Sequence, residues 1–331
     1  MRRRWAAIPG AIAAMALTLA ACVTSQITLP LHPVAAGDQI TIDATPAPLD
    51  PSDPGRTAIG DFVFAGGVSL TSAQTSRLHG LSDLRIQSDG SVFSVTDDGD
   101  LVTGKLVLDR AGRLVGLSAG TLRPLTGLLE EPLEGKDWGD AEGITFMPGG
   151  ATIVSFERHH RVWLYPEVGS KKPVPQPIPS VAMGDNEGME GVAAAPTVGV
   201  NAYWVGVEPG SIWICHLQLA CDEVPGLPRP PAGYGLSALT TGPNGELVIL
   251  HHSYIPAIGS RIIVTIVRDP MGAKTVIGQF ALTPPMTVDN FEGIATVPRG
   301  AGGWRLYILA DDNFSATQRT LMMAFDWTPP K

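Results

Sequence analysis

The sequence predicts an all-β protein, a β-propeller built from short antiparallel sheets around a central channel. Three observations predict it. The 331 residues include 38 Gly and 29 Pro but only 17% charged residues, which indicates short elements joined by tight turns. No long amphipathic helical pattern follows the first ~25 residues. A pattern with a period of roughly 45 to 60 residues recurs along the chain, which is typical of propeller blades.

The composition also limits the class of protein. The hydrophobic content of 44% is too high for a disordered chain and supplies a sizeable core. The net charge of −9 argues against a nucleic-acid partner, because binding phosphate backbones requires clustered Lys and Arg.

The N-terminus predicts export. Residues 1–21 combine the basic start "MRRRW" with a short apolar stretch, as in a signal peptide, and the sequence Leu19-Ala20-Ala21-Cys22 follows. This tetrapeptide resembles the lipobox of bacterial lipoproteins, in which the cysteine is lipidated; an ordinary signal peptide cut near Ala21 is the alternative. Val23, and not an aspartate, follows Cys22, which resembles outer-membrane lipoproteins more than inner-membrane ones. We therefore expect a lipid anchor at Cys22 as the only membrane contact, on the periplasmic face of the outer membrane.

Residues 22–60 are rich in Pro, Asp, Thr and Ala, as in "DATPAPLDPSDPG", and are expected to form a tether with at most one short strand at "QITI". The propeller domain should span residues 61–331.

Five blade starts are visible within this domain, each with a glycine followed by an aliphatic residue. They read "HGLSDLRI", "AEGITFM", "MEGVAAA", "YGLSALT" and "FEGIATV". Each start is followed by a turn and a second apolar run, such as "TIVSFERH" or "LYILADD". This predicts five blades, or six if the interval between Gly80 and Asp140 contains a divergent one.

The two ends of the domain are expected to close the ring. The last repeat begins at Phe291 and has room for only three strands, whereas "DFVFAGGVSLTS", from Asp61 to Ser72, is a strand without a repeat of its own. Pairing this N-terminal strand with the last blade would remove the exposed sheet edges of an open array.

Cys215 and Cys221 remain as a pair once Cys22 is assigned to the lipid. In an oxidising compartment this spacing predicts a local disulfide, and two buried free thiols are the alternative.

Ionisable residues recur where inner strands begin and where second strands end, and in a propeller these places lie at the same mouth of the channel. The strand starts supply His79, Glu142, Glu190, Tyr234 and Glu292. The strand ends supply Asp97, Asp98, Glu157, Arg158, His159, Glu208, His251, His252, Asp311 and Asp312, and Asp140, Glu187 and Asp289 lie just upstream of three starts.

Converging carboxylates favour a hard divalent cation, calcium above all, because like charges close together oppose ionisation. The expected metal ligands are Glu142, Glu190, Glu292, Asp311 and Asp97. The candidate catalytic residues are Glu142, Glu190, Glu292, Glu157, His159 and His251, and the candidate substrate-binding residues are Arg158, His79 and His252. The alternative is that Glu-Gly recurs because a turn requires glycine and the glutamate caps backbone amides.

The segment "GLSAG", from Gly116 to Gly120, matches the G-x-S-x-G pattern of serine hydrolases but lacks the helix that must follow. Ser118 is therefore not expected to be a nucleophile.

Taken together, "DAEGITF", "FERHHRVWLY", "NEGMEGVA", "DNFEGIA" and "LADDNFSATQRTLMMAFDW" resemble the bacterial phytase-like family described as having esterase-like activity of phytase. The resemblance spans Phe62 to Trp327. It implies a β-propeller, export and hydrolysis of a small-molecule ester or phosphoester, but carries over no catalytic residue. The alternative is a non-catalytic propeller lipoprotein that binds a ligand or an envelope partner. We expect a monomer in either case.

Overall fold

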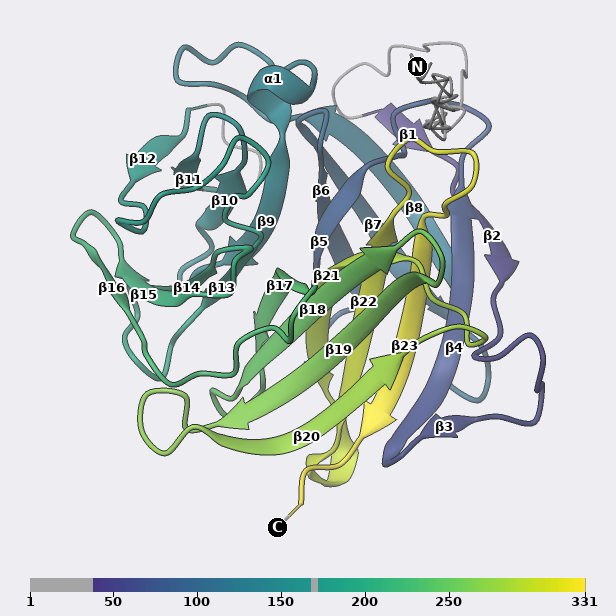
Figure 1. Cartoon of the computed structure of the whole chain (residues 1–331). Coiled ribbons are helices and arrows are strands. Elements are labelled where there is room, and N and C mark those ends of the chain that lie inside the picture. The colour runs from purple at the N-terminus through teal and green to yellow at the C-terminus, as the bar shows by residue number, and fades with distance from the viewer. Residues whose placement is uncertain (1–37, 168–171, 331) are drawn as a thin grey trace, which may run out of the picture.

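The computed structural model describes residues 38–167 and 172–330, and these residues form a five-bladed β-propeller (Figure 1). The expected signal peptide and the expected lipidation site, Cys22, lie outside the described residues. Within them, no helix has the length and apolar character needed to cross a membrane.

Each blade is an antiparallel sheet. Strand labels follow the order of the chain, and the strands of each blade are given below from the channel outwards. Blade 1 contains β5 (Leu81–Ile86), β6 (Ser91–Thr96), β7 (Asp100–Leu108), β8 (Leu114–Pro124) and β1 (Asp38–Ile40). Blade 2 contains β9 (Ala141–Phe146), β10 (Thr152–Phe156), β11 (Arg161–Tyr165) and β12 (Val174–Gln176). Blade 3 contains β13 (Gly191–Ala194), β14 (Ala202–Gly206), β15 (Ile212–His216) and β16 (Cys221–Glu223). Blade 4 contains β17 (Gly235–Thr241), β18 (Leu247–Ile255), β19 (Gly259–Arg268) and β20 (Thr275–Leu282). Blade 5 contains β21 (Asn290–Pro298), β22 (Trp304–Asp311), β23 (Leu321–Trp327), β4 (Phe62–Thr71) and β2 (Asp43–Pro46), with β3 (Ala58–Ile59) also paired to β4. Two single-turn helices, α1 (Lys136–Gly139) and η1 (Gly300–Gly302), lie in connections.

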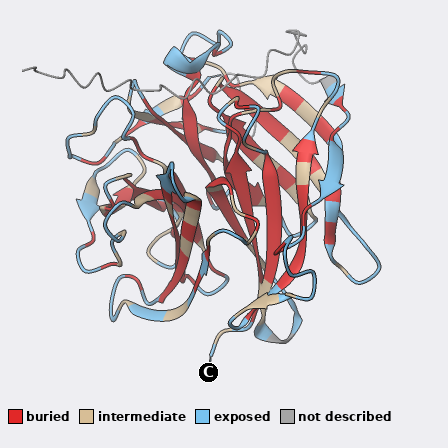
Figure 2. Cartoon of the chain, turned by 45° about the vertical axis from the view of Figure 1, so that its right-hand side comes forward, coloured by how far each residue is buried: buried red, intermediate tan, exposed pale blue. Residues whose placement is uncertain are grey.

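The apolar core is divided among the contacts between neighbouring blades. The inner strands β5, β9, β13, β17 and β21 each contact the next, and the last contacts the first, so the ring is closed. Five clusters of buried apolar residues occupy the five junctions between blades. Figure 2 shows the inner strands buried almost throughout, whereas the exposed residues gather in loops and on outer strands.

The predicted ring closure is confirmed, because β4 pairs with β23 and so completes blade 5 with the N-terminal strand (Figure 1). Phe62 of β4 stacks on Trp327 of β23, with ring centroids 5.3 Å apart, and also contacts Phe280 of blade 4 at 4.7 Å. The described part of the expected tether differs from the prediction. It supplies β1, β2 and β3, which satisfy their backbone groups on the outer edges of blades 1 and 5.

The glycines that follow Glu142, Glu190 and Glu292 lie where inner strands of adjacent blades approach each other closely. They are Gly143, Gly191 and Gly293. A Cβ on Gly191 would lie 2.5 Å from the backbone nitrogen of Leu239 in blade 4. The corresponding distances are 3.1 Å from Gly143 to Val192 N in blade 3 and 3.0 Å from Gly293 to Leu84 N in blade 1. None of the three has a positive φ, so close approach and not turn geometry requires the glycine.

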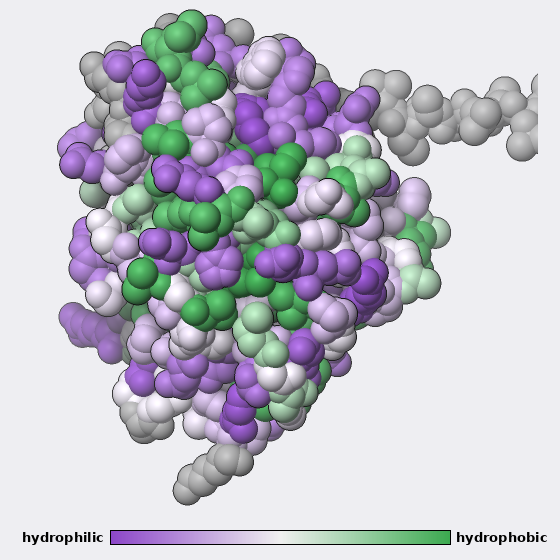
Figure 3. Space-filling view, turned by 90° about the vertical axis from the view of Figure 1, so that its left-hand side faces the viewer, coloured by the Kyte–Doolittle hydropathy of each residue, from purple (hydrophilic) through white to green (hydrophobic). Residues whose placement is uncertain are grey.

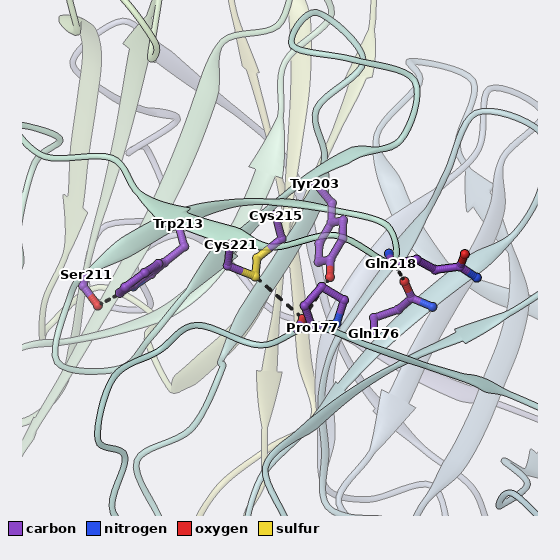
Figure 4. Close-up of a disulfide and its surroundings, with 8 residues drawn as sticks. All are labelled: Gln176, Pro177, Tyr203, Ser211, Trp213, Cys215, Gln218 and Cys221. Carbon is purple, nitrogen blue, oxygen red and sulfur yellow. Dashed lines mark hydrogen bonds between the residues drawn. A yellow bond between two sulfur atoms is a disulfide. The ribbon is translucent and has the colours of Figure 1, made fainter.

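Cys215 and Cys221 form a disulfide that joins β15 to β16 (Figure 4). The surrounding hydrogen bonds connect the outer edge of blade 2 to blade 3. Tyr203 Oη donates to Pro177 O at 3.2 Å, and the backbone N–H of Gln218 donates to Gln176 Oε1 at 3.0 Å. The disulfide therefore lies in a region where two blades are held together by polar contacts.

Candidate functional site

Glu142 and Glu292 are the extra residues of β-bulges at the starts of inner strands. In blade 2, Gly143 pairs with Ser155 and Ala141 pairs with Phe156, which leaves Glu142 without a partner in the ladder. A bulge redirects the side chain that it inserts. Here it turns a carboxylate toward the mouth of the channel.

Blade 5 repeats this arrangement, since Phe291 and Gly293 have ladder partners and Glu292 between them has none. In blade 3, Glu190 directly precedes β13, and its Oε1 accepts a hydrogen bond from the backbone N–H of Gly188 at 3.0 Å. The three glutamates therefore reach the same end of the channel from three blades.

These glutamates line one cavity of about 240 Å³, which we call the acidic mouth. Its lining residues come from blades 1, 2, 3 and 5 and from connections between blades. They are Asp97, Lys136, Glu142, Glu157, Arg158, Asn186, Glu190, Glu208, Glu292, Asp311 and Asn313. The structure thus brings together all five expected metal ligands, together with Glu157 and Arg158.

The sequence predicts that His79 and Tyr234 occupy the equivalent places in blades 1 and 4, and this is wrong. In blade 4 the bulged residue is Ser237, whose Oγ donates to Phe291 O at 3.1 Å. In blade 1 the irregular stretch contains Ser82, whose Oγ donates to Asp97 Oδ1 at 3.0 Å. The blade starts share a glycine, but the irregular residue lies two positions after this glycine in blades 1 and 4 and one position before it in blades 2 and 5.

His79 instead contacts Asp312, with Nδ1 and Oδ2 2.5 Å apart, and is not among the residues that line the acidic mouth. Asp312 also accepts hydrogen bonds from Gly80 N and Thr320 Oγ1. A carboxylate held by several donors in this way orients the imidazole ring.

The other three histidine candidates also lie outside the acidic mouth. His251 and His252 are part of β18, and neither Nε2 has a hydrogen-bond partner among the described residues. Burial lowers the pKa of both imidazoles to about 4, which keeps them neutral at physiological pH. His159 is exposed and stacks on Trp138, with ring centroids 3.8 Å apart.

Burial and mutual repulsion raise the pKa values of the carboxyl groups in the acidic mouth. Desolvation raises the pKa of Glu142 well above its ordinary value, and the charges of Glu190 and Asp97 raise it further. Desolvation followed by repulsion from Asp311 does the same for Glu292. The pKa of Glu157 rises to about 7, first through burial and then through Asp140. Seven carboxylates share this cavity with two cationic side chains, and this imbalance causes the repulsion.

The two cations are held by buried aspartates. Lys136 Nζ lies 2.6 Å from Asp97 Oδ2 and 3.4 Å from Asp140 Oδ1, and Arg158 Nε lies 2.7 Å from Asp140 Oδ2. Arg158 has φ 56°, a left-handed conformation that costs a non-glycine residue about 1 kcal/mol or more.

Lys136 is the main residue that the sequence analysis missed. Its signal was the spacing in "KDWGD", which places Lys136 four residues before Asp140, as an ion pair across one helical turn requires. The exposed amides Asn186 and Asn313 were missed as well, and nothing in the blade repeat indicated them.

Asp97 and Glu142 of the acidic mouth form a triad with Asp140, which lies just behind the lining of the cavity, and one carboxylate oxygen of each lies within 4.8 Å of the others. Asp140 Oδ1 is buried and accepts no hydrogen bond from the described residues. Glu142 is 7% exposed, and no described residue donates a hydrogen bond to its carboxylate. Buried oxygen donors without hydrogen bonds fit a hard divalent cation such as calcium.

The channel is closed below the acidic mouth by the side chain of Arg85 in β5. Its guanidinium donates to the carbonyl oxygens of Ile294, Val192 and Leu239, which belong to blades 5, 3 and 4. A separate pocket of about 230 Å³ lies on the far side of Arg85 and is lined mainly by threonine and alanine. Arg85 therefore separates this pocket from the acidic mouth.

Helix α1 also borders an apolar pocket of about 400 Å³, which contains Leu128, Trp138 and Trp163 together with Glu131 and Glu134. Trp138 is 52% exposed. Figure 3 shows that the face on the side of blades 2 and 3 mixes hydrophobic and hydrophilic residues, with a hydrophobic group at its upper edge.

Ser118, which the sequence analysis rejected as a nucleophile, lies inside the outer strand β8 and pairs with Lys105. A continuous strand does not provide the sharp turn that exposes a nucleophilic serine.

The sequence matches the family model described as "Phytase-like: Esterase-like activity of phytase" over residues 76–314. No curated protein matches the chain. Among solved structures, the chain is similar to the major allergen Mala s 1 of Malassezia sympodialis, with 12% identity, coverage of 82% of this chain and 90% of that chain, and a TM-score of 0.45. It is also similar to a streptogramin B lyase, with 12% identity, coverage of 87% and 97%, and a TM-score of 0.39. Neither likeness indicates a ligand or a reaction for this chain.

Proposed function

The chain belongs to the phytase-like family characterised by esterase-like activity of phytase, and from this premise we propose that it hydrolyses a small-molecule ester or phosphoester at the acidic mouth with the help of a divalent cation, calcium above all. One observation carries the proposal. Seven carboxylates from four blades converge on a single cavity with only two cationic side chains. This excess of negative charge favours binding of a hard cation.

Asp97, Asp140 and Glu142 are the residues best placed to hold the cation, since their carboxylate oxygens are the closest together. Glu190, Glu292 and Asp311 line the same cavity and add negative charge around it. A bound divalent cation supplies a Lewis acid that polarises the ester and lowers the pKa of water.

The remaining side chains position the substrate and handle protons. Arg158 is exposed at the cavity and offers guanidinium N–H groups to a phosphate or carboxylate oxygen. Glu157 has a pKa of about 7 because of burial, and so it can accept a proton from an attacking water near neutral pH. The cation also has an electrostatic role, because without it seven carboxylates would repel an anionic substrate.

We also propose that the chain acts outside the cytoplasm as a lipoprotein. The lipobox-like sequence at Cys22 supports this, and the disulfide between Cys215 and Cys221 suits an oxidising compartment. Incorporation of a labelled fatty acid by the full chain, and its loss in Cys22→Ala, is the expected result. Equal labelling of both proteins would contradict the lipid anchor.

The hydrolase proposal is tested with Glu142→Gln and Glu292→Gln, measured with chromogenic phosphate and carboxylic esters in the presence and absence of calcium. Both substitutions keep the side-chain volume and remove one charge, and we expect at least a ~100-fold loss of calcium-dependent hydrolysis. The matched control is Glu223→Gln on the outer strand β16, where the carboxylate pairs with Arg229 on the surface. Thermal unfolding verifies that all three variants fold.

Unchanged turnover of folded Glu142→Gln and Glu292→Gln would overturn the proposed site. Calcium binding without hydrolysis of any ester would favour the second candidate, a propeller that binds an anionic ligand through the cation and does not hydrolyse it.

A further inference from the structure

Lys136 occupies the part of the acidic mouth where the carboxylates are closest together. Its Nζ lies 2.6 Å from Asp97 Oδ2 and 3.4 Å from Asp140 Oδ1, so one ammonium group contacts two of the three residues of the triad. The lysine side chain nevertheless remains 43% exposed. It is therefore free to leave the carboxylates without disturbing a packed core.

The element that carries Lys136 is a single helical turn. Helix α1 spans four residues and begins after Gly135, which has φ 72° and makes no side-chain cap. An isolated turn of this length is not stable by itself, because helix nucleation is unfavourable. The ion pairs from Lys136 to Asp97 and Asp140 are thus part of what holds the turn against the mouth.

Two further observations indicate that the triad has capacity for another cation. Asp140 Oδ1 is buried and has the ammonium of Lys136 at 3.4 Å but no hydrogen bond, and the Glu142 carboxylate, 7% exposed, forms no ion pair with a described residue. Arg158 already binds the other oxygen of Asp140. Lysine and arginine therefore neutralise two of the three charges, and Glu142 is left without a cationic partner.

We propose that Lys136 is a built-in counter-ion of the acidic mouth and that a divalent cation displaces it from Asp97 and Asp140 on binding. This inference rests on the proposed function for the presence of the cation. It adds that Lys136 sets the affinity of the mouth, because each binding event must first break two ion pairs of the protein.

Lys136 opposes binding of the cation in two ways: its ammonium group occupies the position of the cation, and its charge repels the cation at short range. Calcium binds carboxylate oxygens at about 2.3 to 2.6 Å, and Asp97 Oδ2 already has an ammonium nitrogen at 2.6 Å. An ammonium group and a divalent ion about 4 Å apart repel each other by about 2 kcal/mol even in water, which corresponds to about a 30-fold change in affinity. Removal of the lysine charge should therefore tighten cation binding.

The test is calorimetric titration of calcium into the wild-type chain and three variants. We expect Lys136→Gln to bind calcium at least about tenfold more tightly than wild type. Lys136→Arg keeps the charge and should restore weak binding. Lys105→Gln is the matched control, since Lys105 makes a 2.6 Å ion pair with Asp89 at 44% exposure but lies on the outer part of blade 1. Its affinity should equal that of wild type.

A second measurement follows the lysine itself. Acetylation of Lys136, quantified by mass spectrometry, should increase when calcium is added, whereas acetylation of Lys105 should not change. Equal calcium affinity in wild type and Lys136→Gln, weaker binding in Lys136→Gln, or no calcium binding by either would overturn the inference. If Lys136→Gln binds more tightly but neither protein hydrolyses an ester, the counter-ion role stands and the proposed hydrolytic function fails.

Discussion

Arg85 and Asp83 form an ion pair of 2.8 Å at the centre of the propeller, and between them they contact the inner strands of all five blades. Asp83 Oδ2 accepts a hydrogen bond from the backbone N–H of Ile144 in blade 2 at 3.0 Å, while Arg85 donates hydrogen bonds to carbonyl oxygens in blades 3, 4 and 5. Both residues are buried, and burial raises the pKa of Asp83 to about 6. This pair fills the axis with polar groups whose hydrogen bonds depend on ring closure.

Arg85→Met should therefore destabilise the protein strongly. It leaves Asp83 as an uncompensated buried charge and removes the donor from three strand carbonyls, and breaking one partner of such a pair costs about 3 to 5 kcal/mol. Urea unfolding measures this loss. Asp83→Asn combined with Arg85→Met should cost clearly less than the sum of the two single variants. Strict additivity would mean that the two side chains act independently.

Phe62 should contribute much more to stability than its neighbour Val63. Phe62 is 2% exposed and contacts Trp327 and Phe280, whereas Val63 is 52% exposed on the other face of β4. We expect Phe62→Ala to cost about 3 to 5 kcal/mol and Val63→Ala less than about 1 kcal/mol. Urea unfolding of the two variants checks this difference. Similar losses in both would show that β4 does not close the ring through its inward face.

His251 should make the protein less stable in mild acid. Burial lowers its folded-state pKa to about 4, below its ordinary value of 6.5, so the unfolded chain binds more protons between these values. Its contribution to stability is therefore complete above pH 6.5 and is lost as the pH falls toward 4. Buried carboxyls such as Asp100, whose pKa burial raises to about 6, act in the opposite direction.

Comparison with His251→Phe isolates the histidine from these carboxyls. The free energy of unfolding of wild type should fall more than that of the variant between about pH 7 and pH 4.5, by up to about 3 kcal/mol. Parallel pH profiles would show that the imidazole is not desolvated in the folded state.

The disulfide should stabilise the protein modestly, because Cys215 and Cys221 are separated by only 6 positions. Closing so short a loop restricts the unfolded chain by about 2 kcal/mol in the chain-entropy description. Chemical denaturation of wild type with and without reductant measures this contribution, and Cys215→Ala combined with Cys221→Ala should be insensitive to the reductant. A loss of more than about 5 kcal/mol would indicate that the bond also supports the contact between blades 2 and 3.

The five blades, their boundaries and the closing strand could be predicted from the sequence because each depends on local signals. Apolar runs of strand length alternate with Gly-, Pro- and Asn-containing turns. The strand from Asp61 to Ser72 precedes the first repeat and belongs to none, so it is available to complete the last blade. The three glutamates were predictable for the same reason, since each directly precedes the glycine and the aliphatic residue that mark a blade start.

The remaining features depend on contacts between segments far apart in the chain. Nothing local to "SDLRI" shows that Arg85 reaches three other inner strands. Only the bulge in β17 shows that Ser237, not Tyr234, corresponds to Glu292. Lys136 enters the acidic mouth from a connection that follows no blade repeat. His251 and His252 were misplaced because β18 does not end there but continues to Ile255, so the two histidines are not at the end of the second strand.

The close approach of backbones at Gly143, Gly191 and Gly293 sets the distance between neighbouring inner strands and so the width of the central channel. The width of the acidic mouth is consequently determined by main-chain contact, which varies little, and not by the volume of adaptable side chains. A methyl group added at one of these glycines would force two blades apart and lengthen every carboxylate separation across the ring. The same dipeptide thus supplies a carboxylate and the close backbone contact that sets its distance from the carboxylates of the other blades.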